Sequence, residues 1–147
     1  ERDSAEYRVL HDWVSAGMPR RVETAPKLTG IMVEPSDRVL AKQTQQQLRV
    51  TAKYSDGSTR DVTRLTAYLS NEAALVAVDD TGLMTAGPIV GDTAVMARYL
   101  GHIAVCNVAV PHSHPVPDDY YAKLPQNNFI DGFVWTKLKT LNLTLSD

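Results

Sequence analysis

The sequence contains one cysteine and no long hydrophobic run, and each absence excludes a class of protein. Cys106 is the single cysteine among 147 residues. A disulfide within the chain, a Cys-x-x-Cys zinc site and a Cys-x-x-Cys-His haem attachment are therefore excluded. No apolar run approaches the roughly 20 residues that a membrane-spanning helix needs. The sequence predicts neither a disulfide-rich scaffold nor a helical membrane span.

Long basic runs and catalytic motifs are also absent. The formal net charge is −2, and Arg20-Arg21 is the only pair of adjacent basic residues. A surface that follows nucleic-acid phosphates needs a basic patch or stripe, so we expect no nucleic-acid partner. The sequence also has no glycine-rich phosphate loop and no nucleophile elbow. These features predict a protein that is not an enzyme and holds no cofactor.

The centre of the chain carries the strongest structural pattern. Apolar and polar residues alternate along residues 48–54, which places the apolar side chains on one face of a strand. Asp56 and Gly57 then supply the residue types of a tight turn, and residues 59–63 return to an extended pattern. A hairpin with one apolar face needs a second sheet to cover that face.

Strand-like segments follow one another at short, even spacing over residues 28–110. The longest pair is 93–99 and 104–110, with Gly101 at the bend. About seven short strands with frequent turn signals predict a mainly β protein, an Ig-like antiparallel β-sandwich with a short helix at each terminus. Cys106 lies on the apolar face of its strand, so we expect a buried thiol that behaves as a small apolar side chain.

The two ends of the chain have helical periodicity. Residues 4–16 predict a helix with Ser4 as N-cap, Gly17 at its end, and an apolar stripe of Tyr7, Leu10, Trp13 and Val14. A second helix begins after Asn128 and has an apolar stripe of Ile130, Phe133, Val134, Leu138 and Leu141.

Proline-rich segments over residues 18–27 and 111–125 have no periodicity and predict linkers. We therefore expect residues 1–27 to be the tail of a preceding domain. Residues 28–111 would be the sandwich, and residues 112–147 the start of a following domain. The first and last residues look cut from a longer protein.

Turn aspartates are one set of candidate metal ligands. Asp56 and Asp61 flank the central turn, and Asp79 and Asp80 occupy another turn. Calcium favours clustered oxygen ligands of this kind. The alternative is that each aspartate accepts hydrogen bonds from its own turn backbone.

His112 and His114 are a second candidate metal set. In an extended segment two residues apart they point the same way, and Asp118 and Asp119 follow closely. The alternative is that both histidines are solvated residues of a proline-rich linker.

The order of the strand segments resembles the bacterial immunoglobulin-like domain of group 2. The resemblance covers residues 28–111. The matching motifs are Leu28-x-x-Ile31-x-Val33-x-Pro35, Tyr54-Ser55-Asp56-Gly57 with Asp61-Val62-Thr63, Val78-Asp79-x-x-Gly82-Leu83-Met84-Thr85-Ala86, Gly91-x-x-Ala94-Val95-x-Ala97 and Val108-x-Val110-Pro111. It implies an Ig-like sandwich of a surface or exported bacterial protein, outside the cytoplasm, which serves as a spacer or adhesion module.

The arms have resemblances of their own. Leu10-x-x-Trp13-Val14-x-x-Gly17-Met18-Pro19 is similar to the closing helix of a c-type cytochrome module in planctomycete-type exported proteins. Ile130-Asp131-x-Phe133-Val134-x-x-Lys137-Leu138 is similar to the opening of the uncharacterised domain that follows the Ig-like domain there. The sequence departs from that pattern at Leu145, where proline is usual, and it has no haem-binding motif.

Two functions follow from these patterns. The first is a non-catalytic spacer or protein-contact module, with the flanking domains as partners and with self-association through the unpaired helical stripes. The second is a carbohydrate- or matrix-binding adhesin domain that stacks its ligand on tyrosines. Tyr120 and Tyr121 are the candidate binding residues, and Tyr54, Tyr68 and Tyr99 are further tyrosines of this kind.

Overall fold

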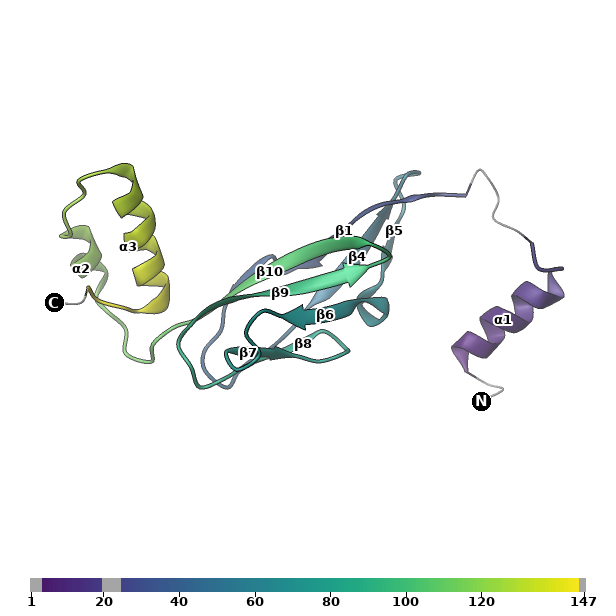
Figure 1. The fold of residues 1–147 in the computed structure, drawn as a ribbon, viewed down its shortest axis with the longest axis horizontal. Helices are drawn as coiled ribbons and strands as arrows, with labels where there is room; N and C mark the ends of the chain where they lie inside the picture. The colour runs from purple at the N-terminus through teal and green to yellow at the C-terminus, as the bar shows by residue number, and fades with distance from the viewer. Residues whose placement is uncertain (1–3, 20–24, 146–147) are drawn as a thin grey trace.

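The structure is a computed structural model that describes residues 4–19 and 25–145. Figure 1 shows an elongated β-sandwich with α1 at one end and the pair α2 and α3 at the other. The elements in chain order are α1 (Ala5–Ser15), β1 (Leu28–Glu34), β2 (Asp37–Val39), β3 (Gln45–Gln47), β4 (Arg49–Tyr54), β5 (Thr59–Asp61), a 3₁₀ turn (Thr63–Leu65), β6 (Ala67–Ser70), β7 (Val76–Val78), β8 (Leu83–Ala86), β9 (Gly91–Tyr99), β10 (His102–Val110), α2 (Asp118–Ala122) and α3 (Phe129–Leu141).

The strands form three sheets in the orders β1-β4-β5, β2-β10-β9-β6 and β3-β8-β7. The predicted mainly β sandwich is confirmed, with two refinements. The described ranges contain ten short strands instead of about seven. One of them, β3, precedes the predicted strand over residues 48–54 and pairs with β8, and Leu48, whose N–H donates to the Gly82 carbonyl at 2.9 Å, separates it from β4. The pairing is also not wholly antiparallel, because β2 runs parallel to β10 with Asn107 opposite Asp37.

The predicted hairpin is formed by β4 and β5, with Thr51 opposite Asp61. Gly57 has φ of 82°, a conformation that favours glycine. The Tyr54 N–H donates to the Ser58 carbonyl at 2.9 Å and closes the turn. The turn is at the predicted position, and its one residue with positive φ is the glycine.

The core lies between the four-stranded sheet and the other two. Along β4 the predicted alternation is present, since Val50 and Ala52 are fully buried while Arg49 and Lys53 are exposed. The buried apolar side chains come from both layers and are Val33, Leu40, Leu48, Val50, Ala52, Val62, Leu75, Val76, Met84, Ala86, Val95, Ala97, Cys106, Val108 and Val110. The sandwich thus buries its apolar faces against each other.

The N-terminal helix α1 has the predicted boundaries. Ser4 is its N-cap, and the Ser4 Oγ accepts from the Tyr7 N–H at 3.1 Å. At the other end Gly17 has φ of 79°, and the Met18 N–H donates to the Trp13 carbonyl at 3.0 Å, a bond typical of a Schellman motif. The Arg20-Arg21 pair and residues 22–24 of the predicted linker lie outside the described residues.

The C-terminal segment differs from its prediction. The predicted linker over residues 111–125 contains the short helix α2. Asp118 and Asp119 stand in the first turn of α2, where carboxylates interact favourably with the helix dipole. Tyr121 is buried and its hydroxyl donates to the Leu143 carbonyl at 3.0 Å. Contact with the segment after α3 therefore stabilises a helix that local sequence does not reveal.

The helix α3 is capped at both ends and fixed to the sandwich. Asn128 forms the predicted N-cap as part of a capping box with Asp131, and Asn142 ends the helix in the left-handed region. The His112 N–H donates to the Leu141 carbonyl at 2.9 Å, and Lys137 pairs with Asp92 of β9 at 2.7 Å. The C-terminal arm is therefore docked on the sandwich.

The apolar stripe predicted for α3 is only partly covered. Leu141 is buried and Leu138 is half-buried, whereas Ile130, Phe133 and Val134 are exposed. The covered residues lie in the C-terminal half of the helix, next to α2 and β10. The N-terminal half presents its apolar side chains to solvent.

Candidate functional site

The turn between β7 and β8 uses one of the candidate aspartates as an internal acceptor. The Asp79 Oδ1 accepts from the Thr81 N–H at 2.8 Å, the Thr81 hydroxyl at 2.7 Å and the Leu83 N–H at 3.0 Å. These hydrogen bonds, led by the one from the Thr81 side chain, lower the pKa of the Asp79 carboxyl. The neighbouring Asp80 is exposed.

Asp56 and Asp61 have the same kind of local partner. The Asp56 Oδ1 accepts from the Ser58 hydroxyl at 2.6 Å and the Ser58 N–H at 2.9 Å, and the Asp61 Oδ1 accepts from the Thr63 N–H at 2.9 Å. Hydrogen bonds from Ser58 and Thr63 lower the pKa of these two carboxyl groups. The candidate calcium ligands therefore serve separate turns.

The histidine candidates lie after β10. The rings of His112 and His114 have centroids 5.9 Å apart and are tilted by 43°. The carboxylates expected beside them pair with lysines instead, because Asp118 lies 3.1 Å from Lys139 and Asp119 lies 2.8 Å from Lys123. Within residues 4–19 and 25–145 no three His, Cys, Asp or Glu side chains are grouped so that they could hold a metal ion.

The candidate binding tyrosines Tyr120 and Tyr121 stand edge to face with ring centroids 5.3 Å apart. Tyr121 is buried, so its ring is not presented to a ligand. The Tyr120 hydroxyl accepts from the Leu145 N–H at 3.0 Å. Both rings therefore help to hold α2 against the segment that follows α3.

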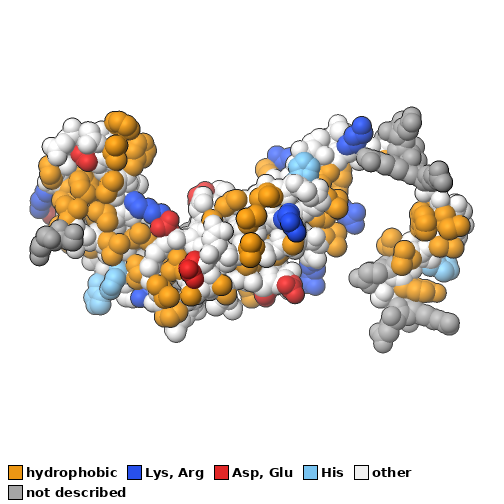
Figure 2. Space-filling model, in the orientation of Figure 1, with side chains coloured by type: hydrophobic (Ala, Val, Ile, Leu, Met, Phe, Trp, Pro, Cys, Tyr) orange, Lys and Arg blue, Asp and Glu red, His pale blue; other side chains and the backbone are white. Residues whose placement is uncertain are grey.

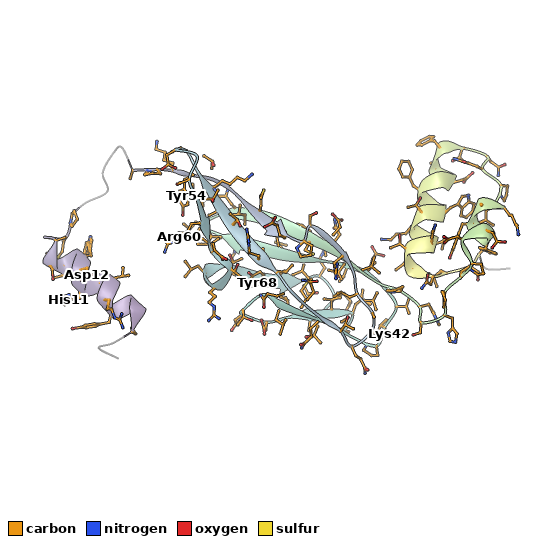
Figure 3. The ribbon with its side chains drawn as sticks, turned by 180° about the vertical axis from the view of Figure 1, so that it is seen from behind. His11, Asp12, Lys42, Tyr54, Arg60 and Tyr68 are labelled. Carbon is orange, nitrogen blue, oxygen red and sulfur yellow. The ribbon has the colours of Figure 1, made fainter. Side chains whose placement is uncertain are left out.

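The remaining tyrosines belong to the sandwich. Tyr54, Tyr68 and Tyr99 are half-buried and pack against the core. The Tyr68 hydroxyl donates to the Thr63 carbonyl at 2.9 Å, and burial raises the pKa of that hydroxyl. Figure 3 labels Tyr54 and Tyr68 at different places along the sandwich, so they do not form a common stacking platform.

A groove that the sequence did not predict lies between the four-stranded sheet and α3. Its volume is about 530 Å³, and its walls include Asp37, Asp92, Asn107 and Lys137. The Asn107 Nδ2 donates to the Asp37 Oδ1 at 2.9 Å, which together with a hydrogen bond from Ser36 lowers the pKa of the Asp37 carboxyl. Figure 2 shows basic and acidic side chains meeting where the helical pair joins the sandwich.

No local signal could have revealed this groove. Asp37 and Asn107 are 70 residues apart in sequence and meet only through the parallel pairing of β2 with β10. Lys137 reaches Asp92 only because α3 folds back onto the end of β9. Two polar pairs line the groove, Asn107 with Asp37 and Lys137 with Asp92, and the second pair joins α3 to the sandwich. Thr93 also lines the groove, and its hydroxyl is buried with no hydrogen-bond partner among the described residues.

Cys106 has the burial expected from its strand position. Its side chain is fully buried, and removal from water raises the pKa of the thiol to about 11. A thiol with such a pKa is almost wholly protonated at neutral pH, so it has little nucleophilic character.

Known proteins provide an independent comparison. No model of a known protein family matches the chain. An S-layer-related protein of Niallia circulans is 48% identical over 64 residues, which are 44% of this chain and 4% of that protein. The chain thus spans a very small part of its curated relative.

Solved structures show the same fold. The S-layer protein rSbsC(31-844) superimposes with a TM-score of 0.52 and 22% identity, over 67% of this chain and 15% of that one. Domains 5–6 of the S-layer protein SbsC give a TM-score of 0.51 and 22% identity, over 63% and 48% of the two chains. At these identities the likeness concerns the fold alone. In the described part of the chain, no helix is long and apolar enough to span a membrane.

Proposed function

We propose that this chain is a non-catalytic structural module of a larger exported bacterial surface protein, in which the sandwich sets the spacing and orientation of the parts before and after it. Two similarities support this proposal. The chain is similar in sequence to an S-layer-related protein, and its fold is similar to that of domains of S-layer proteins. In this role the module lies outside the cytoplasm.

The observation that carries the proposal is the path of the chain. The strand β1 enters the sandwich at the end near α1, and β10 leaves it at the opposite end, near α2 and α3 (Figure 1). The strands β9 and β10 each have nine residues, which corresponds to about 30 Å of rise. A rigid body whose connections leave from opposite ends holds its neighbours apart at a fixed distance.

The internal use of polar groups supports the same role. The aspartates Asp56, Asp61 and Asp79 accept hydrogen bonds from their own turns, and Lys137 and Asp92 fasten the C-terminal arm. We further propose that residues 28–111 are a group 2 bacterial Ig-like domain. Residues 1–27 and 112–147 are then the arms that connect it to the parts of the protein before and after it.

Domain replacement in the full-length protein tests this function. Residues 28–111 are exchanged either for an unrelated Ig-like sandwich of equal length or for a flexible Gly/Ser linker. Because only spacing and stiffness matter for a spacer, the unrelated sandwich should preserve surface assembly and the flexible linker should impair it. Loss of assembly with the unrelated sandwich would contradict the proposal. If the unmodified chain then bound a glycan array, the adhesin function would replace it.

A further inference from the structure

The described part of the C-terminal arm, residues 112–145, is held together by contacts of its own. The Tyr121 hydroxyl of α2 donates to the Leu143 carbonyl after α3 at 3.0 Å. Tyr121 and Leu141 are both buried, and neither belongs to the buried apolar cluster at the centre of the sandwich. Figure 1 shows α2 and α3 side by side beyond the end of the strands. The arm is therefore a small body separate from the sandwich.

The chain passes from the sandwich to this arm at Pro111. Val110, just before it, is fully buried at the end of β10. His112, just after it, moves with the arm, because its N–H donates to the Leu141 carbonyl and its carbonyl accepts from the Asn142 side chain, each at 2.9 Å. The proline ring fixes φ of Pro111. Rotation about ψ of Pro111 is then the main backbone motion that turns the arm against the sandwich.

An ion pair joins the two bodies a second time. The Lys137 Nζ of α3 lies 2.7 Å from the Asp92 Oδ2 of β9, and both side chains are about half exposed. Within residues 25–145, this pair is the only hydrogen bond or ion pair between the arm and the sandwich. The helix α3 also contacts β10, beside the groove of about 530 Å³ described above. The angle of the arm thus depends on a single polar contact.

We propose that the Lys137–Asp92 pair is a latch that fixes the angle of the C-terminal arm, and that the arm turns about Pro111 when the pair opens. The latch rests on the proposed function in that the arm leads to the next part of the protein, and it adds how the orientation of that part is controlled. Exposed ion pairs are weak, so loss of the pair should change the ratio of latched to open arms by up to about fivefold. Because salt screens exposed charges, the ionic strength around the protein sets this ratio.

A second lysine of the same helix provides a matched control. Lys139 is as exposed as Lys137 and also pairs with a carboxylate, at 3.1 Å. Its partner, Asp118, belongs to α2, so this pair lies within the arm. Loss of the Lys139–Asp118 pair removes the same kind of contact without releasing the arm from the sandwich.

Distance measurements by electron paramagnetic resonance between two nitroxide labels test the latch. The labels are attached through Lys53→Cys in β4 and Phe129→Cys in α3, both exposed, in a Cys106→Ala background. With the latch intact, the whole chain should give a narrow distribution of distances at low salt. The distribution should broaden near 1 M salt, where the Debye length falls to about 3 Å. Lys137→Glu should give a broad distribution at every salt concentration.

Two further variants make the result decisive. Lys139→Glu should keep the narrow distribution at low salt, since it breaks a pair inside the arm. Lys137→Glu combined with Asp92→Lys should restore the narrow distribution and its dependence on salt, because the pair forms again with its charges exchanged. Circular dichroism should show that every variant keeps the helical content of the parent chain.

Four outcomes would overturn the latch. They are a narrow distribution in Lys137→Glu, a broad one in Lys139→Glu, no recovery with the exchanged charges, and a parent distribution that does not change with salt. The domain replacement described above remains a separate test. Both of its inserts lack Asp92, so its outcome depends on spacing and stiffness and not on the latch.

Discussion

The sandwich and the helical arms have equally clear apolar patterns but bury them differently. In the sandwich each apolar strand face meets another from the same chain, so residues such as Val50 and Val95 are fully buried. In the arms the stripes of α1 and the N-terminal half of α3 stay exposed. Periodicity thus identifies which side of an element is apolar, whereas the presence of a second apolar face decides whether that side is buried. Among the described residues, the sandwich thus covers the apolar faces between its own sheets, and the arms leave apolar faces uncovered.

The largest expected effect compares one core residue with one arm residue. Leu48 is fully buried, so Leu48→Ala should lower the free energy of unfolding by about 2–5 kcal/mol through lost burial and a residual cavity. Phe133→Ala removes a larger side chain, but an exposed one, and should change that free energy by less than about 0.5 kcal/mol. Urea unfolding of dilute protein measures both. A comparable loss for the two variants would contradict the comparison.

The second prediction concerns pH and the buried thiol. The pKa of Cys106 rises from 9.0 to about 11 in the folded state, so stability is complete below pH 9 and falls as pH rises toward 11, where the unfolded thiol gains by ionising. The loss attributable to Cys106 should reach about 2 kcal/mol. Unfolding curves from pH 8 to 11 measure it, with Cys106→Ala as the variant that lacks this dependence. Identical pH profiles for the two proteins would refute the assignment.

The third prediction compares two adjacent aspartates. Asp79→Ala removes the acceptor for Thr81 and Leu83 and should lower the melting temperature by a few degrees, whereas Asp80→Ala should leave it nearly unchanged. Because the pKa of Asp79 is lowered on folding, its contribution is present above the unfolded value of 3.8 and is lost as pH falls through the lower folded value. Thermal melts between pH 2 and 7 test this order. Adding millimolar calcium to the same melts tests the calcium hypothesis, and an unshifted transition would end it.

The smallest expected effect is at the joint between the sandwich and α3. The Lys137–Asp92 pair is about half exposed, and pairs of this kind contribute about 0–1 kcal/mol. A double-mutant cycle with Lys137→Ala and Asp92→Ala should therefore give a coupling energy within that range. Each of the two substitutions should also speed amide hydrogen exchange in α3 and leave exchange in the core strands unchanged. A coupling well above this range would mean that the arm is part of the cooperative fold.

Much of the fold follows from local sequence. The alternation along β4, the Asp56-Gly57 turn, the Ser4 and Asn128 caps and the buried Cys106 all depend on residues within a few positions of each other. Such features are predictable because the physical cause is local.

The rest depends on contacts between distant segments. The parallel pairing of β2 with β10 needs residues 70 positions apart, and α2 forms where Tyr121 meets the segment after α3. The roles of the candidate site residues are less predictable from the sequence than the fold is. The aspartate and tyrosine patterns were visible in the sequence, but the same residue types serve turns and packing, and only coordinates show that Asp79 and Tyr121 are used internally.

The most direct test of the central claim is the thermal unfolding of residues 28–111 alone, followed by circular dichroism. A sandwich that is complete in itself should give a β-rich spectrum and a cooperative transition within a few degrees of that of the whole chain. An unfolded spectrum, or a transition that appears only when the helical arms are restored, would contradict the claim.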